Sequence, residues 1–596
     1  MNLRCFALVW ALISPLAVIA RDVQFRVVSF EGQKVDVNIN GATAALTAAA
    51  GGPYFTGTAS VADGAGDIIY LYVVDGKPEN GTRILPSGAT RTYNDLIGRT
   101  VSYRKLPLFP NPFPTKPKWT RESNPLPLYD DGFVPILHIT APPEQINQMD
   151  QLKLPGVTGS LDIFYADAVD SFQNVIYAMH KDNADYAAKR AVDIGLTGSD
   201  SITGRKYFKL RDLSTEPSLM REVTYTHMLR AAGVICPNQV HVRLYVNKVP
   251  YGLFAITDYV QLKFGINGST WENFPATAFH NGNPTSPIVN WFDGSSGSFG
   301  YFGEDPAAYN GFNTDNPLSP NVKDLIPAIA VLDQIKGTDA GADKFATMFD
   351  VDQIFVSMVF EYLTSSWDNY WSANSNFGLY LDPETKKWFY IPQDFDYTFS
   401  MDSPGDVPTS TYIDWEQGRS RNPSQNLTAP LINNLLAAPA YRKRFEETLI
   451  SIVSKLFNPV AFNRRITAHA DLLSEDVRWD LTIPRKMVGK PNRYQYEDFV
   501  QSINGTVPVS GTYYSLTEWV AARAGTVAKQ FNFQWDAVVQ DDASPATPGL
   551  TGDAPGTGSH PNGPGSGTEA STSGGIREVA EVGLGVFVFV AGLWVL

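Results

Sequence analysis

Acidic and amide side chains gather over residues 367–399, and these are the residues best suited to metal chemistry. They are Asp368, Asn374, Asn376, Asp394 and Asp396. Their neighbours are aromatic and aliphatic, and a carboxylate buried among such residues needs a cation or hydrogen-bond donors. Mg²⁺ meets that need when it is held by one or two carboxylates and by nucleotide phosphates. The segment therefore favours phosphoryl transfer from a nucleotide bound with a divalent metal such as Mg²⁺.

Two of the carboxylates follow a strand-like run, Trp388-Phe389-Tyr390-Ile391-Pro392. If extended backbone continues, Asp394 and Asp396 lie on one face and Phe395 points oppositely into apolar packing. Both carboxylates are then candidate metal ligands that converge on one ion. A simpler interpretation stays open, because Asp-x-Asp also suits a turn or a cap.

Asp368 follows an expected helix over 351–366 and is a candidate general base or further metal ligand. Asn374 and Asn376 would add neutral oxygen ligands. The alternative for Asp368-Asn369 is a turn that ends the helix.

A basic strand over 205–211 is the candidate phosphate-binding element. Alternation places Lys209 and Arg211 on one face and Lys206 on the other. Any of these cations would suit nucleotide phosphates, and Glu222 in the following helix could pair with a lysine. The alternative is a solvated edge strand protected by its charges. The sequence lacks the usual kinase signatures. It also lacks the zinc-protease motif His-Glu-x-x-His and the hydrolase motif Gly-x-Ser-x-Gly.

The periodicity predicts two kinds of folded region. Residues 21–105 alternate apolar and polar side chains between closely spaced turns, with strands at 23–27 and 67–74, which is typical of a small β-sandwich. Residues 128–540 mix both periods without regular alternation, which predicts an α+β domain. The expected helices are 143–152, 217–232, 323–336, 351–366, 428–456 and 459–475. The expected strands are 205–211, 240–247, 251–257, 377–381 and 387–392.

The two ends predict secretion and lipid anchoring. Arg4, the apolar run after it and Val18-Ile19-Ala20 form a signal peptide. Small residues, a polar spacer and the apolar run from Gly583 to Leu596 form a glycosylphosphatidylinositol (GPI) attachment signal, with Ser573 as the expected attachment residue. We expect a protein on the outer face of the plasma membrane or in the cell wall. The expected domains are 1–20 signal peptide, 21–105 β domain, 106–127 proline-rich linker, 128–540 α+β domain, 541–575 disordered stalk and 576–596 removed propeptide.

The composition agrees with a folded extracellular protein. The formal net charge is −14, which argues against nucleic-acid binding. Cys236 is the one cysteine left after signal cleavage, and it is expected to be a buried thiol. Glycosylation sequons occur at Asn80, Asn267, Asn426 and Asn504.

Several segments resemble the CotH family of atypical kinases, especially its fungal cell-surface members. They are Lys206 to Arg211 with Pro217 to Arg221, Val242 to Asn247 with Tyr251 to Phe254, and Trp367-Asp368-Asn369-Tyr370 through Trp388 to Asp396. The resemblance covers about residues 128–540 and implies a divergent protein-kinase-like domain. It implies Mg-ATP-dependent phosphorylation of protein Ser or Thr, with Lys209 or Lys206 on the phosphates, Asp368 catalytic, and Asp394 and Asp396 on the metal.

The resemblance also leaves two rival functions open. The fungal surface members resemble invasins, which bind host-cell receptors from a lipid anchor without catalysis. A structural spore-coat or cell-wall protein with a decayed site is the third possibility.

Overall fold

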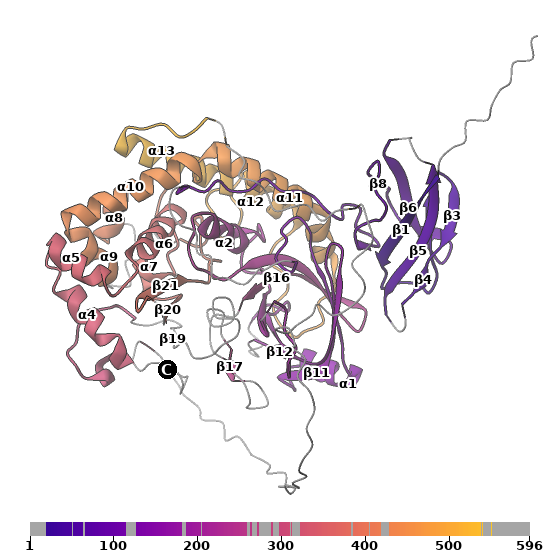
Figure 1. Ribbon diagram of the computed structural model, residues 1–596, viewed down its shortest axis with the longest axis horizontal. Helices are drawn as coiled ribbons and strands as arrows, with labels where there is room; N and C mark the ends of the chain where they lie inside the picture. The colour runs from indigo at the N-terminus through magenta and orange to yellow at the C-terminus, as the bar shows by residue number, and fades with distance from the viewer. Residues whose placement is uncertain are drawn as a thin grey trace, which may run out of the picture. The chain divides into compact units, whose positions relative to one another are not determined.

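The computed structural model describes the parts of the chain that carry the two folded regions (Figure 1). The described residues are 20–49, 52–62, 66–114, 127–180, 186–203, 205–258, 263–264, 271–272, 288–289, 297–309, 312, 322–382, 385–403, 406–418, 428–537, 539 and 550. Most of the expected signal peptide, the propeptide, Ser573, Asn267 and Asn426 lie outside them. Asn80 and Asn504 are described and exposed, as glycosylation acceptors must be, and their glycosylation stays a prediction.

The N-terminal region consists of two β-sheets that share one apolar core. The first sheet has the order β4-β5-β1-β9, and the second joins β3, β2, β6 and β7, with β8 paired to β6. The strands are β1 (Ala20–Val28), β2 (Val35–Ile39), β3 (Ala42–Ala45), β4 (Thr47–Ala48), β5 (Tyr54–Ala62), β6 (Ile68–Val74), β7 (Lys77–Pro78), β8 (Arg83–Leu85) and β9 (Asp95–Leu96). Val23 and Phe25 of β1 pack in the same cluster as Val37 and Tyr72 from the other sheet. The strands expected at 23–27 and 67–74 are confirmed.

One residue of the expected stalk contacts these sheets. The backbone N–H groups of Thr90 and Arg91 donate to the carbonyl oxygen of Leu550 at 2.8 and 3.2 Å. The Leu550 side chain packs against the apolar core of the N-terminal sheets. At this residue the chain is held by the N-terminal region.

A closed seven-stranded barrel follows, in the order β10-β11-β12-β13-β14-β16-β15. Its strands are β10 (Ile136–Thr140), β11 (Gly156–Phe164), β12 (Val169–Met179), β13 (Val192–Gly195), β14 (Tyr207–Arg211), β15 (Gln239–Val246) and β16 (Val249–Asp258), with helix α1 (Pro143–Asp150) between β10 and β11. Neighbours pair antiparallel, except that β10 and β15 pair parallel and close the barrel. The strands expected at 205–211, 240–247 and 251–257 are confirmed. Closure was not expected, because it depends on pairing between distant segments.

The remaining described elements form a mainly helical region around one hairpin. Its helices are α2 (Arg221–Ala231), α4 (Ile326–Asp333), α5 (Asp339–Ala346), α6 (Val351–Thr364), α7 (Tyr370–Ala373), α8 (Tyr412–Glu416), α9 (Pro430–Ala437), α10 (Pro439–Lys455), α11 (Pro459–Thr482), α12 (Tyr496–Asn504) and α13 (Leu516–Phe531). Its strands β20 (Phe377–Leu381) and β21 (Trp388–Pro392) form the hairpin, and β19 (Ile288–Val289) pairs with β20. Short elements complete the set: strands β17 (Lys263–Phe264) and β18 (Trp271–Glu272), and the 3₁₀ turns Pro306–Tyr309 and Val322–Asp324.

Helix α6 is the centre of this region, and α10 and α13 pack along it (Figure 1). Every residue of α6 except Asp352 is buried, as expected for a helix enclosed on all sides. Asp350 caps its start by accepting from the Gln353 N–H, and Ser365 ends it in the left-handed conformation. Cys236 is a buried thiol in the same core, as expected. None of the described helices combines the length and apolarity needed to span a bilayer.

Several expected helices differ from the structure in their bounds, and the one expected over 459–475 continues to Thr482 as α11. The helix expected over 428–456 is two helices, because Pro439 begins α10 directly after the extended residue Ala438. The helix expected over 217–232 begins only at Arg221. The Glu216 carboxylate accepts from the backbone N–H groups of Ser218 and Arg221, which holds the preceding residues in a turn.

Glu361 of α6 joins three elements at the base of the hairpin. Its carboxylate accepts from the Trp371 N–H at 2.7 Å and from the Tyr390 hydroxyl at 3.0 Å. The side chain is fully buried, and burial raises the pKa of Glu361 to about 8. Folded protein therefore retains a proton on Glu361 that the unfolded chain releases at lower pH.

We expect Glu361→Gln to reduce the loss of stability between about pH 4.5 and pH 8. A carboxyl group with a raised pKa in the folded state binds more protons there than in the unfolded chain, so its contribution to the free energy of unfolding falls as pH rises. Across this window the free energy of unfolding of Glu361→Gln minus that of wild type should increase by about 1.4 kcal/mol per pH unit. Denaturant unfolding at several pH values measures it. Glu447→Gln, at a 64% exposed side chain, is the control. Parallel curves for wild type and Glu361→Gln would contradict the assignment.

Candidate functional site

A cavity of about 640 Å³ lies where the barrel meets the helical region. Its lining comes from β14 and the loop after it, the adjoining ends of β15 and β16, the first half of α2, the turn after β21, and the segments 186–191 and 490–493. The predicted site residues that line it are Lys209, Arg211, Glu222, Asp368, Asn376, Asp394 and Asp396. The cavity therefore gathers residues from four separate parts of the sequence.

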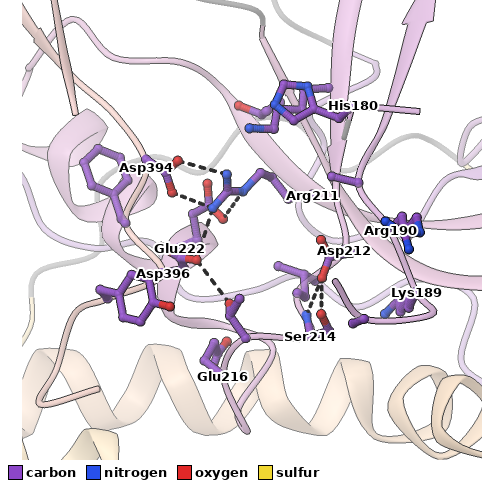
Figure 2. Close-up of a pocket in the computed structure, with 18 of the residues that line it drawn as sticks. His180, Lys189, Arg190, Arg211, Asp212, Ser214, Glu216, Glu222, Asp394 and Asp396 are labelled. Carbon is purple, nitrogen blue, oxygen red and sulfur yellow. Dashed lines mark hydrogen bonds and ion pairs between the residues drawn. The ribbon is translucent and has the colours of Figure 1, made fainter. Parts of the chain in front are cut away.

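Arg211, the last residue of β14, forms the central charge contacts of the cavity (Figure 2). Its Nε donates to the Glu222 carboxylate at 2.9 Å. Its two terminal nitrogens donate to the two oxygens of Asp394 at 3.0 and 2.5 Å. One of them also lies 3.4 Å from a carboxylate oxygen of Asp396. A single guanidinium thus connects three carboxylates, a use to which its planar fork of donors is suited.

The pKa values of the two aspartates shift in opposite directions although both side chains contact Arg211. Burial opposes the charge of Asp394, but Arg211 and Lys209 outweigh it and hold the pKa of Asp394 below its usual range. Burial and the nearby Asp394 carboxylate raise the pKa of Asp396 well above its usual range. The difference follows from geometry, because Asp394 accepts two hydrogen bonds from Arg211 whereas Asp396 has one contact at 3.4 Å.

The aspartates reach the cavity by a different route from the one expected. Strand β21 ends at Pro392, and Asp394 has a φ of 58°, so extended backbone does not continue through it. The continuous-strand expectation was wrong because a left-handed turn intervenes, a conformation that Asp tolerates better than most residues. Phe395 points away as expected, stacking on Tyr225 with ring centroids 4.1 Å apart. The turn still presents both carboxylates to the cavity.

Asp368 is held by amides of the hairpin. Asn376 donates to the carboxylate of Asp368 at 3.0 Å and to its backbone carbonyl at 2.8 Å. Asn369 donates to the carbonyl oxygens of Asn376 and Gln393 at 3.2 and 2.9 Å, tying both sides of the hairpin together. Sequence reasoning missed this positioning role of Asn369, although its place beside Asp368 was a signal.

Lys209 lies two residues before Arg211 and also lines the cavity. Among the described residues, its ammonium forms no hydrogen bond or ion pair. Burial and the adjacent Arg211 lower the pKa of Lys209. Its hydrogen-bond donors are therefore available to an anion in the cavity, whose charge would favour the protonated lysine.

Two predicted residues are not brought to the cavity. The Lys206 ammonium donates to the carbonyl oxygen of Gly198 at 3.0 Å, consistent with its place on the other strand face. The side-chain amide of Asn374 is buried and donates to the carbonyl oxygen of Thr428 at 3.1 Å. Neither residue lines the wall that holds the aspartates.

Other lining residues were missed by sequence reasoning. The Thr215 hydroxyl donates to Asp396 at 3.1 Å from the loop after β14. Basic residues contribute a second wall, and Figure 2 shows Lys189 and Arg190 across the view from Asp394. Lys189 is paired with Asp480 of α11 at 3.0 Å. These residues come from loops without a periodic pattern, so no local signal marked them.

Comparison with known proteins places the chain in a family. The model of the family described as "CotH kinase protein" matches residues 191–507, which include every predicted site residue of the cavity. The chain is 32% identical over 550 residues to "Invasin CotH3" of Rhizopus delemar, covering 90% of this chain and 88% of that protein. It is 30% identical to "Invasin CotH2" of the same organism, over 86% and 84% of the two chains. It is 28% identical to that organism's "Spore coat protein homolog 1", over 91% and 86%. The chain therefore belongs to the CotH family.

Proposed function

We propose that this chain transfers phosphate from ATP to serine or threonine hydroxyls of a protein, with Mg²⁺ or Mn²⁺ as the metal. The observation that carries the proposal is one cavity lined by Lys209, Asp368, Asp394 and Asp396 together. Phosphoryl transfer needs little covalent chemistry from a protein, because positioning and charge stabilisation supply most of the catalysis. These side chains supply both signs of charge and a proton acceptor.

The residues present fit the metal. Asp394 and Asp396 both reach the Arg211 guanidinium, so their carboxylates converge on one place. Within the described residues no group of three or more His, Cys, Asp or Glu could hold a metal alone. That agrees with Mg²⁺, which commonly takes one or two carboxylates and completes its shell with phosphate oxygens and water.

Each side chain has one task in the proposed reaction. Lys209 donates hydrogen bonds to phosphate oxygens. Asp368, oriented by Asn376, accepts the proton of the acceptor hydroxyl as its oxygen bonds to the terminal phosphorus. The bond from that phosphorus to the bridging oxygen breaks, and ADP leaves. Asp394 and Asp396 would hold the metal, which would supply positive charge to offset that of the phosphates.

We further propose that residues 128–540 have a divergent protein-kinase-like fold. Support comes from the pairing of a strand cation, Arg211 of β14, with a helix glutamate, Glu222 of α2, at 2.9 Å. Protein kinases use a comparable pair of a strand lysine and a helix glutamate next to the phosphates. Here arginine takes the place expected of lysine.

The second candidate function is adhesion. Two relatives are named invasins, which supports binding to a host-cell receptor from the cell surface. Adhesion would require the fold and its surface, and none of the cavity chemistry.

We expect Asp396→Asn and Asp368→Asn each to lower phosphotransfer at least ~100-fold, because one removes a metal ligand and the other the proton acceptor. Transfer of radiolabelled phosphate from ATP by the full chain, with Mg²⁺ or Mn²⁺, measures it. The matched control is Asp471→Asn, at a 58% exposed side chain of α11.

The same variants separate the two functions. Binding to host cells should be unchanged in both, provided that their thermal unfolding matches wild type. Wild-type rates in the two folded variants would refute the site assignment. Lack of transfer by wild type itself would leave adhesion as the function.

We also propose that the chain is secreted and held at the outer cell surface by a GPI anchor. The invasin and spore-coat names of its relatives support a surface or wall location. Removal of residues 571–596 should release the protein into the medium, because the small-residue site and the apolar tail are both lost. Immunoblotting of cell and medium fractions measures the release, with a chain shortened only within 555–565 as control. Continued retention of the 571–596 deletion on cells would argue against the anchor.

A further inference from the structure

Arg211 lies between three carboxylates, which need a nearby cation. Its guanidinium contacts Asp394, Asp396 and Glu222, and its side chain is 14% exposed. Three carboxylates this close would repel one another strongly without a cation between them. Arg211 therefore already offsets part of the negative charge of this acidic wall.

The same carboxylate oxygens are the proposed ligands of a divalent metal. A guanidinium and a metal ion cannot both hold the same oxygen lone pairs at close range, and their positive charges repel. Binding of metal at Asp394 and Asp396 thus requires Arg211 to release at least one of them.

The number and length of the contacts that Arg211 makes with each carboxylate identify which carboxylate it releases. Asp394 accepts two hydrogen bonds from Arg211, whereas Asp396 has a single contact at 3.4 Å. Asp396 is also held by the Thr215 hydroxyl at 3.1 Å, so it keeps its place without the guanidinium. The Nε bond to Glu222 at 2.9 Å tethers Arg211 on its far side. Releasing Asp396 therefore costs Arg211 less interaction energy than releasing Asp394 or Glu222.

We infer that Arg211 is a positioning residue that stands in for the metal: it holds Asp394 and Asp396 in the metal-free cavity and yields Asp396 when metal and nucleotide bind. The terminal nitrogen that contacts Asp396 continues to donate to Asp394, and its second N–H is then available to donate to a phosphate oxygen. Lys209 has no such role, because its ammonium holds no carboxylate among the described residues. The inference rests on the proposed function in that it needs metal to bind at these aspartates.

Mn²⁺ binding to the full chain without nucleotide tests the inference. Removing the competing charge in Arg211→Met should tighten Mn²⁺ binding about tenfold or more. Arg211→Lys keeps a charge but loses the fork of donors, and it should bind Mn²⁺ with intermediate affinity. Titration followed by the electron paramagnetic resonance of free Mn²⁺ measures the affinities. Arg442→Met, at a surface pair with Glu416, is the control and should bind as wild type does.

The outcomes separate this inference from the phosphotransfer proposal. Unchanged or weaker Mn²⁺ binding in a folded Arg211 variant would overturn the inference, as would no binding in any variant. If Arg211→Met does not fold, Arg211→Lys decides between the same outcomes. A role in folding alone would weaken Mn²⁺ binding and phosphotransfer together, whereas we expect tighter Mn²⁺ binding with slower transfer. Tighter Mn²⁺ binding in a protein whose wild type transfers no phosphate would support the inference and reject the phosphotransfer proposal.

Discussion

The contact of Arg211 with three carboxylates, buried Glu222 and the partly buried Asp394 and Asp396, is the interaction on which the cavity depends. A charge removed from water is costly unless it is paired and hydrogen-bonded, and truncating one partner of such a group typically costs about 3–5 kcal/mol. Arg211 ends β14, Glu222 lies in the first turn of α2, and Asp394 and Asp396 follow β21. One guanidinium therefore fixes the barrel, the helical region and the hairpin in their places around the cavity.

Hydrogen bonds behind the hairpin hold the other half of the site. Asn369 joins the carbonyl groups on both sides of it, and Asn376 orients Asp368. Glu361 then secures the base of this arrangement to α6 through Trp371 and Tyr390. Polar groups hydrogen-bonded in this way favour one geometry, which phosphoryl transfer requires because most of its catalysis is positioning.

Local patterns in the sequence predicted those parts of the fold that depend on neighbouring residues. The strands at 377–381 and 388–392 and the helix starting at 351 have clear apolar periods, and all are present. The gathering of Asp368, Asp394 and Asp396 at one cavity was also predictable, because the segment concentrates acids beside buried strands. The turn at Asp394 was only the alternative interpretation of Asp-x-Asp, and nothing in the sequence indicated its left-handed backbone.

Features that depend on contacts between distant segments could not be predicted from the sequence. Barrel closure pairs β10 with β15, about a hundred residues apart, and neither strand has a local pattern that identifies its pairing partner. Strand alternation placed Lys209 and Arg211 on one face, but which of them meets Glu222 depends on where α2 starts. The turn at Glu216 places this start at Arg221 instead of at the expected residue 217.

The most direct test of the account is thermal unfolding of the full chain with Mg²⁺ alone, ATP alone and both together. A cavity that binds a metal–nucleotide complex should stabilise the protein most when both are present, by about 2.7 kcal/mol at a hundredfold excess over the dissociation constant. Asp396→Asn should lose the part of this stabilisation that depends on metal. Equal stabilisation in that variant, or no stabilisation of wild type by the two ligands together, would contradict the account.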